Sequence, residues 1–197
     1  MHETIKNFNK QFSYEPAIEN QGTLIRKSDF IVVGMGGSAL AVKLLKIWKP
    51  ELDIVIHSDY GLPELSAEKL KDRLIILSSY SGNTEEVIDA FEKAKEKNLN
   101  IAVISTGGKL LSLAIKNKVP YIKLPDTGIQ PRSALGFSIK AFLKLLGKES
   151  ELKKISKLAT ILNPIDYEKD GKTLAEKMKN SVPVIYASDR NLSLAYN

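Results

Sequence analysis

The stretch DFIVVGMGGSALAVKLL, residues 29–45, decides the fold of this chain. Residues 29–33 are predominantly apolar and predict a buried strand, and residues 34–39 form a glycine-rich loop. Helical periodicity then predicts a helix over 38–48, which ends before Pro50. A strand that ends in small and hydroxylated residues before a helix leaves backbone N–H groups free to bind an anion.

A second stretch repeats this order further along the chain. Residues 74–77 (LIIL) predict a strand, residues 78–86 (SSYSGNTEE) a hydroxyl-rich loop, and residues 84–97 a helix with Thr84 as its cap. Two loops of this kind on one sheet predict a single phosphorylated ligand that is held from two sides.

The remaining pattern predicts the fold class. Further apolar runs predict strands at 54–57, 101–104 and 121–124, and they are continuous rather than alternating. Because they alternate with helical segments, the prediction is an α/β fold: a doubly wound parallel five-stranded sheet with helices on both faces. C-terminal helices at 133–146, 149–163 and 169–180 and one further strand at 182–187 are expected beyond it.

Composition limits the possible functions. The 197 residues are 43% hydrophobic and 26% charged, as in an ordinary globular protein, and no apolar stretch approaches the ~20 residues that span a membrane. The absence of cysteine excludes disulfides, thiolate zinc sites and cysteine nucleophiles. No signal peptide is recognisable at the start. A soluble cytoplasmic protein without a membrane partner is expected.

The net charge of +6 does not predict nucleic-acid binding. Lysines are interleaved with glutamates, as in residues 92–97 (EKAKEK), which is typical of a solvated helix face. We interpret the charge as a modest aid in attracting an anionic metabolite.

The two loops supply the candidate binding residues. Gly36, Gly37 and Ser38 belong to the first loop, and Ser79, Ser81 and Thr84 give the second loop three hydroxyl groups. A helix cap would explain one of these hydroxyls but not so dense a run. No arrangement of His, Asp and Glu suggests a metal site.

Two other functions fit part of the pattern. Gly34, Gly36 and Ala39 match the G-x-G-x-x-[GA] fingerprint of dinucleotide-binding folds, and Asp59 follows the second strand where a ribose-binding acid could lie. A dinucleotide fold needs no hydroxyl-rich loop on its third strand, so a sugar phosphate is favoured. A non-catalytic module that senses a phosphosugar would use the same loops.

Three motifs together carry a family resemblance: residues 36–38 (GGS), 79–86 (SYSGNTEE) and 131–136 (PRSALG). They resemble the motifs of sugar isomerase (SIS) domains, and most of all those of bifunctional phosphoglucose/phosphomannose isomerases. The resemblance covers nearly the whole chain. It implies that Gly37, Ser38, Ser79, Ser81 and Thr84 line a sugar-phosphate site, and that Arg132 lies near the reacting carbons.

The implied activity is the aldose–ketose isomerisation of glucose 6-phosphate or mannose 6-phosphate to fructose 6-phosphate, without a cofactor. This reaction belongs to carbohydrate metabolism, in glycolysis and gluconeogenesis. The resemblance also implies two SIS domains per chain and a homodimer.

Physical chemistry supports the role of Arg132. The residue follows a loop at the carboxyl side of the predicted sheet, where ligands bind in open α/β folds. A fixed guanidinium can hold a sugar hydroxyl or the negative charge of a cis-enediolate. His57, Glu85 and Glu86 are weaker candidates for catalysis, since each has an ordinary structural explanation.

The chain is expected to divide into a sugar-phosphate-binding domain at 1–147, connecting helices at 148–180 and the start of an incomplete second SIS domain at 181–197. By the resemblance, the general base and the ring-opening residue lie beyond Asn197. Phosphate recognition without significant isomerase activity is therefore expected at this length. The last segment is expected to be poorly ordered, packed on the first domain or paired with another chain.

Overall fold

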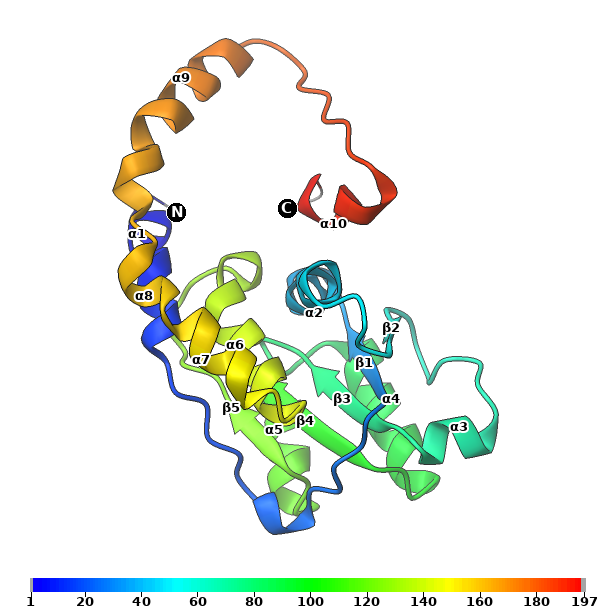
Figure 1. Cartoon of the computed structure of the whole chain (residues 1–197). Coiled ribbons are helices and arrows are strands. Elements are labelled where there is room, and N and C mark those ends of the chain that lie inside the picture. Colours follow the sequence, from blue (N-terminus) through cyan, green and yellow to red (C-terminus); the bar gives the residue numbers. More distant parts are fainter. Residues whose placement is uncertain (1, 196–197) are drawn as a thin grey trace.

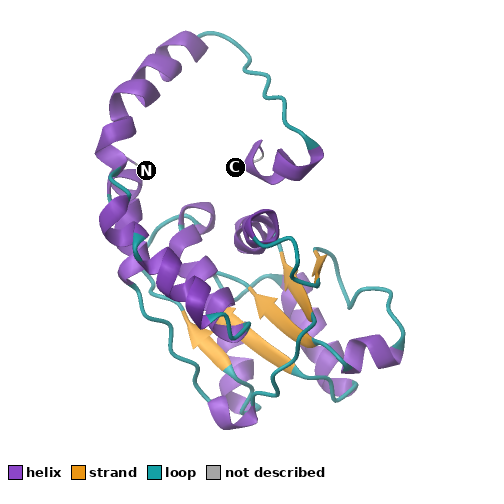
Figure 2. Ribbon diagram, in the orientation of Figure 1, coloured by secondary structure: helices purple, strands orange, loops and turns teal. Residues whose placement is uncertain are grey.

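A five-stranded parallel sheet forms the centre of the molecule (Figures 1 and 2). The computed structural model describes residues 2–195, without the side chains of His2 and Arg190. The strands, in chain order, are β1 (Phe30–Gly34), β2 (Ile54–His57), β3 (Leu74–Ser78), β4 (Ile101–Ser105) and β5 (Tyr121–Lys123). All pair in parallel, in the spatial order β2-β1-β3-β4-β5, which confirms the predicted sheet.

Helices cover both faces of this sheet. They are α2 (Gly36–Trp48) and α6 (Leu135–Leu145) on one face, and α4 (Glu85–Glu96) and α5 (Gly108–Lys116) on the other. Along β1, Phe30 and Val32 pack toward the first pair, whereas Ile31 and Val33 pack toward the second. Burying each of these side chains contributes about 1.5–3 kcal/mol. The doubly wound architecture is therefore confirmed.

The strand order fixes where a ligand can bind. From β1 the chain crosses to β2 on one side, and from β3 it moves away to β4 on the other side. The carboxyl ends of β1 and β3 consequently lie side by side while their following helices diverge to opposite faces. Such a switch point is where open α/β sheets bind ligands.

The amino-terminal segment packs along the sheet and α6. It contains α1 (His2–Lys6), the 3-10 turns η1 (Phe8–Ser13) and η2 (Gln21–Thr23), and a bridge in which Glu19 pairs with Tyr121 of β5. Two backbone hydrogen bonds, 2.9 and 3.1 Å long, join these residues. The segment therefore protects the edge strand of the sheet from pairing with other chains.

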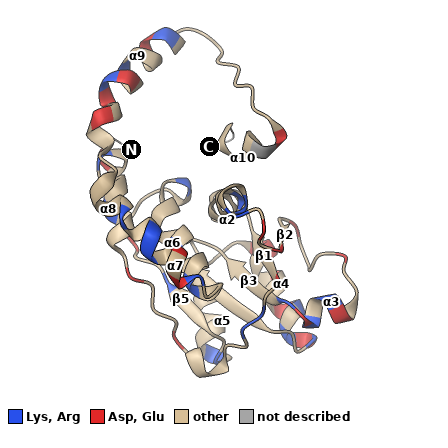
Figure 3. Ribbon diagram, viewed as in Figure 1, with Lys and Arg blue, Asp and Glu red and all other residues tan. Residues whose placement is uncertain are grey.

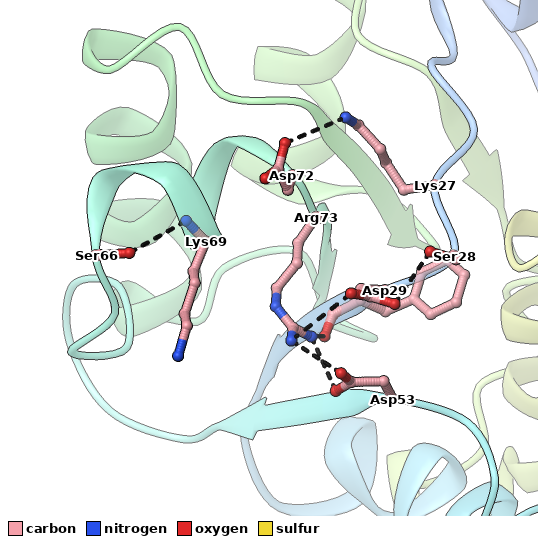
Figure 4. Close-up of polar contacts among 9 residues, drawn as sticks. Lys27, Ser28, Asp29, Asp53, Ser66, Lys69, Asp72 and Arg73 are labelled. Carbon is pink, nitrogen blue, oxygen red and sulfur yellow. Dashed lines mark hydrogen bonds and ion pairs between the residues drawn. The ribbon is translucent and has the colours of Figure 1, made fainter.

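An arginine joins three strands at the amino end of the sheet (Figure 4). Arg73, which follows the short helix α3 (Ala67–Lys71), donates to both carboxylate oxygens of Asp53 at 3.0 Å and to the carbonyl of Phe30 at 3.4 Å. Asp29 lies 3.9 Å from the same guanidinium. The hydrogen bond from Arg73 holds the pKa of Asp53 below its usual value. The sequence patterns did not predict this cluster.

The C-terminal elements extend from α6 in an arc (Figure 1). They are α7 (Glu149–Ser156), α8 (Leu158–Ile161), η4 (Pro164–Tyr167), α9 (Glu168–Met178), η5 (Asp189–Asn191) and α10 (Leu192–Ala195). The predicted helix at 149–163 is divided between Ser156 and Leu158, so α8 starts separately. α10 lies against α2.

The strand predicted at 182–187 was wrong for this structure, which contains no strand there. The side chains of Val182 and Tyr186 are 89% and 92% exposed. A strand requires a hydrogen-bonded neighbour, and this segment runs from the far end of α9 to α10 without lying beside the sheet (Figure 1). Within residues 2–195, no helix is both long enough and apolar enough to cross a bilayer.

Candidate functional site

The two predicted loops meet at the switch point. The backbone N–H of Tyr80, just after β3, donates to the Ser38 hydroxyl in the first turn of α2 at 3.0 Å. Ser58, after β2, donates to the carbonyl of Gly34 at 2.7 Å. Ser38 and Ser79 thus come from segments far apart in sequence to one end of the sheet.

Hydrogen bonds within the second loop set its shape. The Ser79 hydroxyl lies 2.7 Å from that of Thr84 and accepts from the Gly82 N–H at 3.1 Å. Ser79 is only 1% exposed, so the hydrogen bonds of its buried hydroxyl stabilise the loop. Ser81 is exposed and accepts from the Asn83 N–H at 3.3 Å. Of the three hydroxyls, those of Ser81 and Thr84 are the more accessible.

Gly82 and Gly107 bring the second loop into close contact with the loop that follows β4. Gly82 has a φ of +72°, and a Cβ there would overlap the carbonyl oxygen of Gly107. Lys109 donates its backbone N–H to the Asn83 side chain at 3.0 Å. Asn83 thus shapes the loop, a role that the sequence motif does not itself indicate. An Asn beside a glycine in a strand-to-helix loop is the signal that could have indicated it.

Neither helix that follows these loops is capped by a side chain. The cap positions of α2 and α4 are Met35 and Thr84, and neither side chain accepts a bond from its helix. Thr84 occupies the predicted cap position, but its hydroxyl bonds Ser79 instead. The first N–H groups of two long helices therefore converge on one place, where their dipoles favour an anion.

Arg132 reaches this place through close backbone packing. It lies in the 3-10 turn η3 (Pro131–Ser133), just before α6. A Cβ on Gly37 would lie 2.7 Å from the Arg132 nitrogen and 2.9 Å from the Pro131 carbonyl carbon. Only glycine allows η3 to lie so close to α2, so Gly37 determines where Arg132 stands.

The Arg132 side chain is exposed and borders a cavity of about 470 Å³, together with Phe8, Leu135 and Tyr167. Among residues 2–195, its guanidinium has no ion pair or hydrogen bond. The Arg132 backbone nitrogen lies beside Gly37 in the first turn of α2, and an unpaired guanidinium can pair with an anionic group.

The weaker candidates lie on the β2 side of the site. Glu85 accepts a hydrogen bond from the hydroxyl of Tyr60 at 3.2 Å, which raises the pKa of Tyr60. The ring nitrogen Nε2 of His57 lies 3.2 Å from the Tyr60 carbonyl, and Asp59 accepts from the Tyr60 N–H at 2.7 Å. These residues are thus engaged with the loop after β2, and Tyr60 is a contact that the sequence did not indicate.

Charged residues of both signs are interspersed on the helices of the molecule (Figure 3). Glu85 and Glu86 occupy the first turn of α4, and the lysines of α4 lie in its last turn. This arrangement follows the helix dipole. Within the described part of the chain, no three His, Asp or Glu side chains gather as metal ligands would.

Known proteins resemble this chain in sequence. No family model matches it. A bifunctional phosphoglucose/phosphomannose isomerase from Caldicellulosiruptor bescii is 35% identical to it over 207 residues, covering 94% of this chain. A protein of the same description from Aquifex aeolicus is 28% identical and covers 99% of this chain. The chain spans 60% of the length of each of these relatives.

The fold is shared with solved structures. The tagatose-6-phosphate ketose/aldose isomerase of Escherichia coli superposes with a TM-score of 0.57 at 14% identity, covering 98% of this chain and 60% of that one. The protein is thus an α/β protein with the SIS fold of phosphosugar isomerases. More particularly, it is a homologue of the bifunctional phosphoglucose/phosphomannose isomerases.

Proposed function

We propose that this protein binds a hexose 6-phosphate at the switch point and takes part in its aldose–ketose isomerisation. The observation that carries the proposal is the convergence of two uncapped helix N-termini, α2 and α4, on one end of the sheet. A phosphate needs several hydrogen-bond donors and a positive field, and this arrangement supplies both. The names of the relatives, which are isomerases of glucose and mannose phosphates, support the same substrate class.

Each predicted residue has a role in this proposal. The N–H groups of Gly36 and Gly37 face the phosphate from α2, and the hydroxyls of Ser81 and Thr84 bind it from the second loop. Ser38 and Ser79 act mainly on loop shape, since their hydroxyls already accept from Tyr80 and Gly82.

Isomerisation moves a proton between C1 and C2 of the open-chain sugar through a cis-enediolate. Arg132 would stabilise the negative charge that develops on this intermediate, because its backbone stands beside Gly37 and its guanidinium has no partner among the described residues. We assign the proton transfer to no residue of this chain. Glu85, an acid at the end of the second loop, already accepts a hydrogen bond from Tyr60.

The division of the chain into domains and its biological setting are further parts of our proposal. We place residues 1–147 as the sugar-phosphate-binding domain, 148–180 as connecting helices and 181–197 as the start of a further SIS domain. We also propose that the protein is a homodimer. It would act in the cytoplasm, in glycolysis and gluconeogenesis. Interconversion of glucose, mannose and fructose 6-phosphates needs no cofactor.

A ligand titration tests the proposal directly. Fructose 6-phosphate at millimolar concentration should raise the melting temperature of the purified protein, because a ligand that binds only the folded state stabilises it. Fructose is the matched control, since it lacks the phosphate. Ordinary enzymes have KM values up to about 1 mM, so the absence of any shift at roughly 10 mM fructose 6-phosphate would contradict the proposal.

Turnover is measured separately with a coupled assay. Arg132→Lys should bind fructose 6-phosphate nearly normally but should slow isomerisation in any active form, because an ammonium group cannot reproduce the planar guanidinium. Full activity in this variant would remove Arg132 from the mechanism. Binding without turnover would favour a phosphosugar sensor, and NAD(H) fluorescence changes would favour a dinucleotide site.

A further inference from the structure

We infer that Gln11 is a positioning residue that holds the Arg132 turn in the geometry needed to stabilise the enediolate. The inference rests on the proposed function, because it needs Arg132 to act on that charge. Gln11 lies in η1, in the amino-terminal segment, and it is 3% exposed.

The Gln11 side chain forms hydrogen bonds with the backbone of both η3 and α6. Its amide nitrogen donates to the carbonyl of Ser133 at 2.6 Å, and its amide oxygen accepts from the N–H of Gly136 at 2.9 Å. Ser133 is the residue directly after Arg132, and Gly136 lies in the first turn of α6. One side chain therefore fixes the backbone on the carboxyl side of Arg132.

The bond to Gly136 replaces a missing helix cap. The cap position of α6 is Ala134, which has no side-chain acceptor. The first N–H groups of a helix need a partner when they are buried, and Gly136 is buried. Gln11 supplies this partner from 125 residues away in the sequence.

Packing leaves little freedom at this contact. A Cβ on Gly136 would lie 2.6 Å from the Cβ of Gln11, so η1 and α6 touch through a glycine. Next to Gln11, the buried ammonium of Lys140 donates to the carbonyl of Phe12 and to Glu15, both at 2.8 Å. The amino-terminal segment is thus fastened to α6 at Gln11 and at the residues that follow it.

Arg132 is consequently held from two directions. Gly37 of α2 packs against its backbone nitrogen, and Gln11 bonds the residue that follows it. Because the guanidinium itself has no ion pair or hydrogen bond among the described residues, the backbone of this turn sets the point from which the side chain reaches a ligand. A shift of this turn would misplace the charge without emptying the phosphate site.

Two ligands separate this role from a general loss of structure. Arabinonate 5-phosphate carries a carboxylate where the enediolate carries its charge, whereas fructose 6-phosphate has the same phosphate and a neutral head. Gln11→Met, which keeps the length of the side chain and removes both hydrogen bonds, should weaken arabinonate 5-phosphate binding about tenfold. The affinity for fructose 6-phosphate should change by less than about twofold.

A double-mutant cycle links the effect to Arg132. In an Arg132→Ala background, the Gln11→Met change should alter the affinity for arabinonate 5-phosphate by less than about twofold, because the charge it positions is gone. Asn9→Ala is the matched control: Asn9 lies in the same turn, but it donates to Ala159 of α8 at 3.0 Å rather than to the Arg132 turn. This variant should bind both ligands as the wild type does.

The outcomes distinguish the two proposals. If the wild-type protein binds neither ligand, the proposed function and this inference both fail. If the wild type binds both and Arg132→Ala loses its preference for arabinonate 5-phosphate, an unchanged preference in Gln11→Met overturns the inference alone. Equal weakening of both ligands also overturns it, since that indicates only structural damage. Should Gln11→Met not fold, Gln11→Glu, which keeps an acceptor for Gly136, should show the same selective loss.

Discussion

The two ends of the central sheet are built on different principles. At the carboxyl end, Ser79, Ser81 and Thr84 make short-range hydrogen bonds, and the Arg132 guanidinium is unpaired within the described chain. At the amino end, the Arg73 guanidinium donates hydrogen bonds to Asp53 and to a backbone carbonyl, and it forms an ion pair with Asp29. Arg132 can therefore bind a ligand, whereas the hydrogen bonds and ion pairs of Arg73 stabilise the fold. If ligand binding and stability are divided between these two ends, changes at the carboxyl end should mainly reduce binding and changes at the amino end should mainly reduce stability.

The largest effect is expected from Gly37→Ala, at the carboxyl end. Its Cβ would meet the backbone of η3 at 2.7 Å, so Arg132 must move. We expect sugar-phosphate binding to be lost and the free energy of unfolding to fall by about 1–3 kcal/mol. Calorimetric titration and urea unfolding measure the two quantities. Gly171→Ala is the control, because nothing lies within 4 Å of a Cβ there; normal binding by Gly37→Ala would contradict the close packing.

Removing the second loop's accessible hydroxyls should weaken binding while the protein stays folded. The double variant Ser81→Ala/Thr84→Val loses hydrogen bonds worth about 0.5–1.5 kcal/mol each, or more where the acceptor is a charged phosphate. We therefore expect the affinity for fructose 6-phosphate to fall about 10-fold or more, as measured by titration calorimetry. Ser28→Ala, at the opposite end of the sheet, should bind normally. An unchanged affinity in the double variant would place the phosphate elsewhere.

The amino end should show the reverse behaviour. Arg73→Met removes the bidentate pair with Asp53 from a side chain that is only 13% exposed, and it should lower the free energy of unfolding by about 1–3 kcal/mol. The affinity for fructose 6-phosphate should stay within about twofold of the wild-type value, because the proposed phosphate site lies at the opposite end of the sheet. Lys71→Met, on the exposed neighbouring helix, is the control for loss of a positive charge. A large loss of affinity in Arg73→Met would show that the two ends are coupled.

The smallest expected effect is a change in acid sensitivity. Arg73 lowers the pKa of Asp53 in the folded protein, so this pair adds stability above the unfolded pKa of about 3.8, and the contribution is lost as pH falls through the folded pKa. The stability difference between wild type and Arg73→Met should therefore be largest near neutral pH and should shrink below about pH 4. Urea unfolding of both proteins from pH 7 to pH 2.5 measures it. A difference that does not vary with pH would indicate that packing, rather than charge, accounts for Arg73.

The sequence predicted the elements whose signal is local. Each strand of the sheet was recognised as an apolar run, and the loops at 34–39 and 78–86 follow β1 and β3 as expected. The same local reading failed at 182–187, where an apolar segment remains exposed. Whether such a segment becomes a strand depends on a neighbour, and no local pattern contains that information.

The candidate site was predictable in part. The structure brings Ser38 to Tyr80 and Gly37 to Arg132, which joins the three sequence motifs at one end of the sheet. The direction of the hydroxyls was not predictable. Ser79 and Ser81 are equivalent in a list of motif residues, yet Ser79 is buried and Ser81 is exposed. Their difference arises because β3 ends between buried neighbours while Ser81 stands at the loop surface.

By itself, the sequence determined the parallel α/β sheet and the two anion-type loops, because the periodicity of apolar residues and the glycine positions act over a few residues. The tertiary structure decided which partners meet across the chain. Arg73 joins three strands, and Gln11 caps a helix whose own cap residue is Ala134. Such long-range hydrogen bonds depend on how whole elements pack, and packing places Gln11 beside Gly136 although 125 residues separate them.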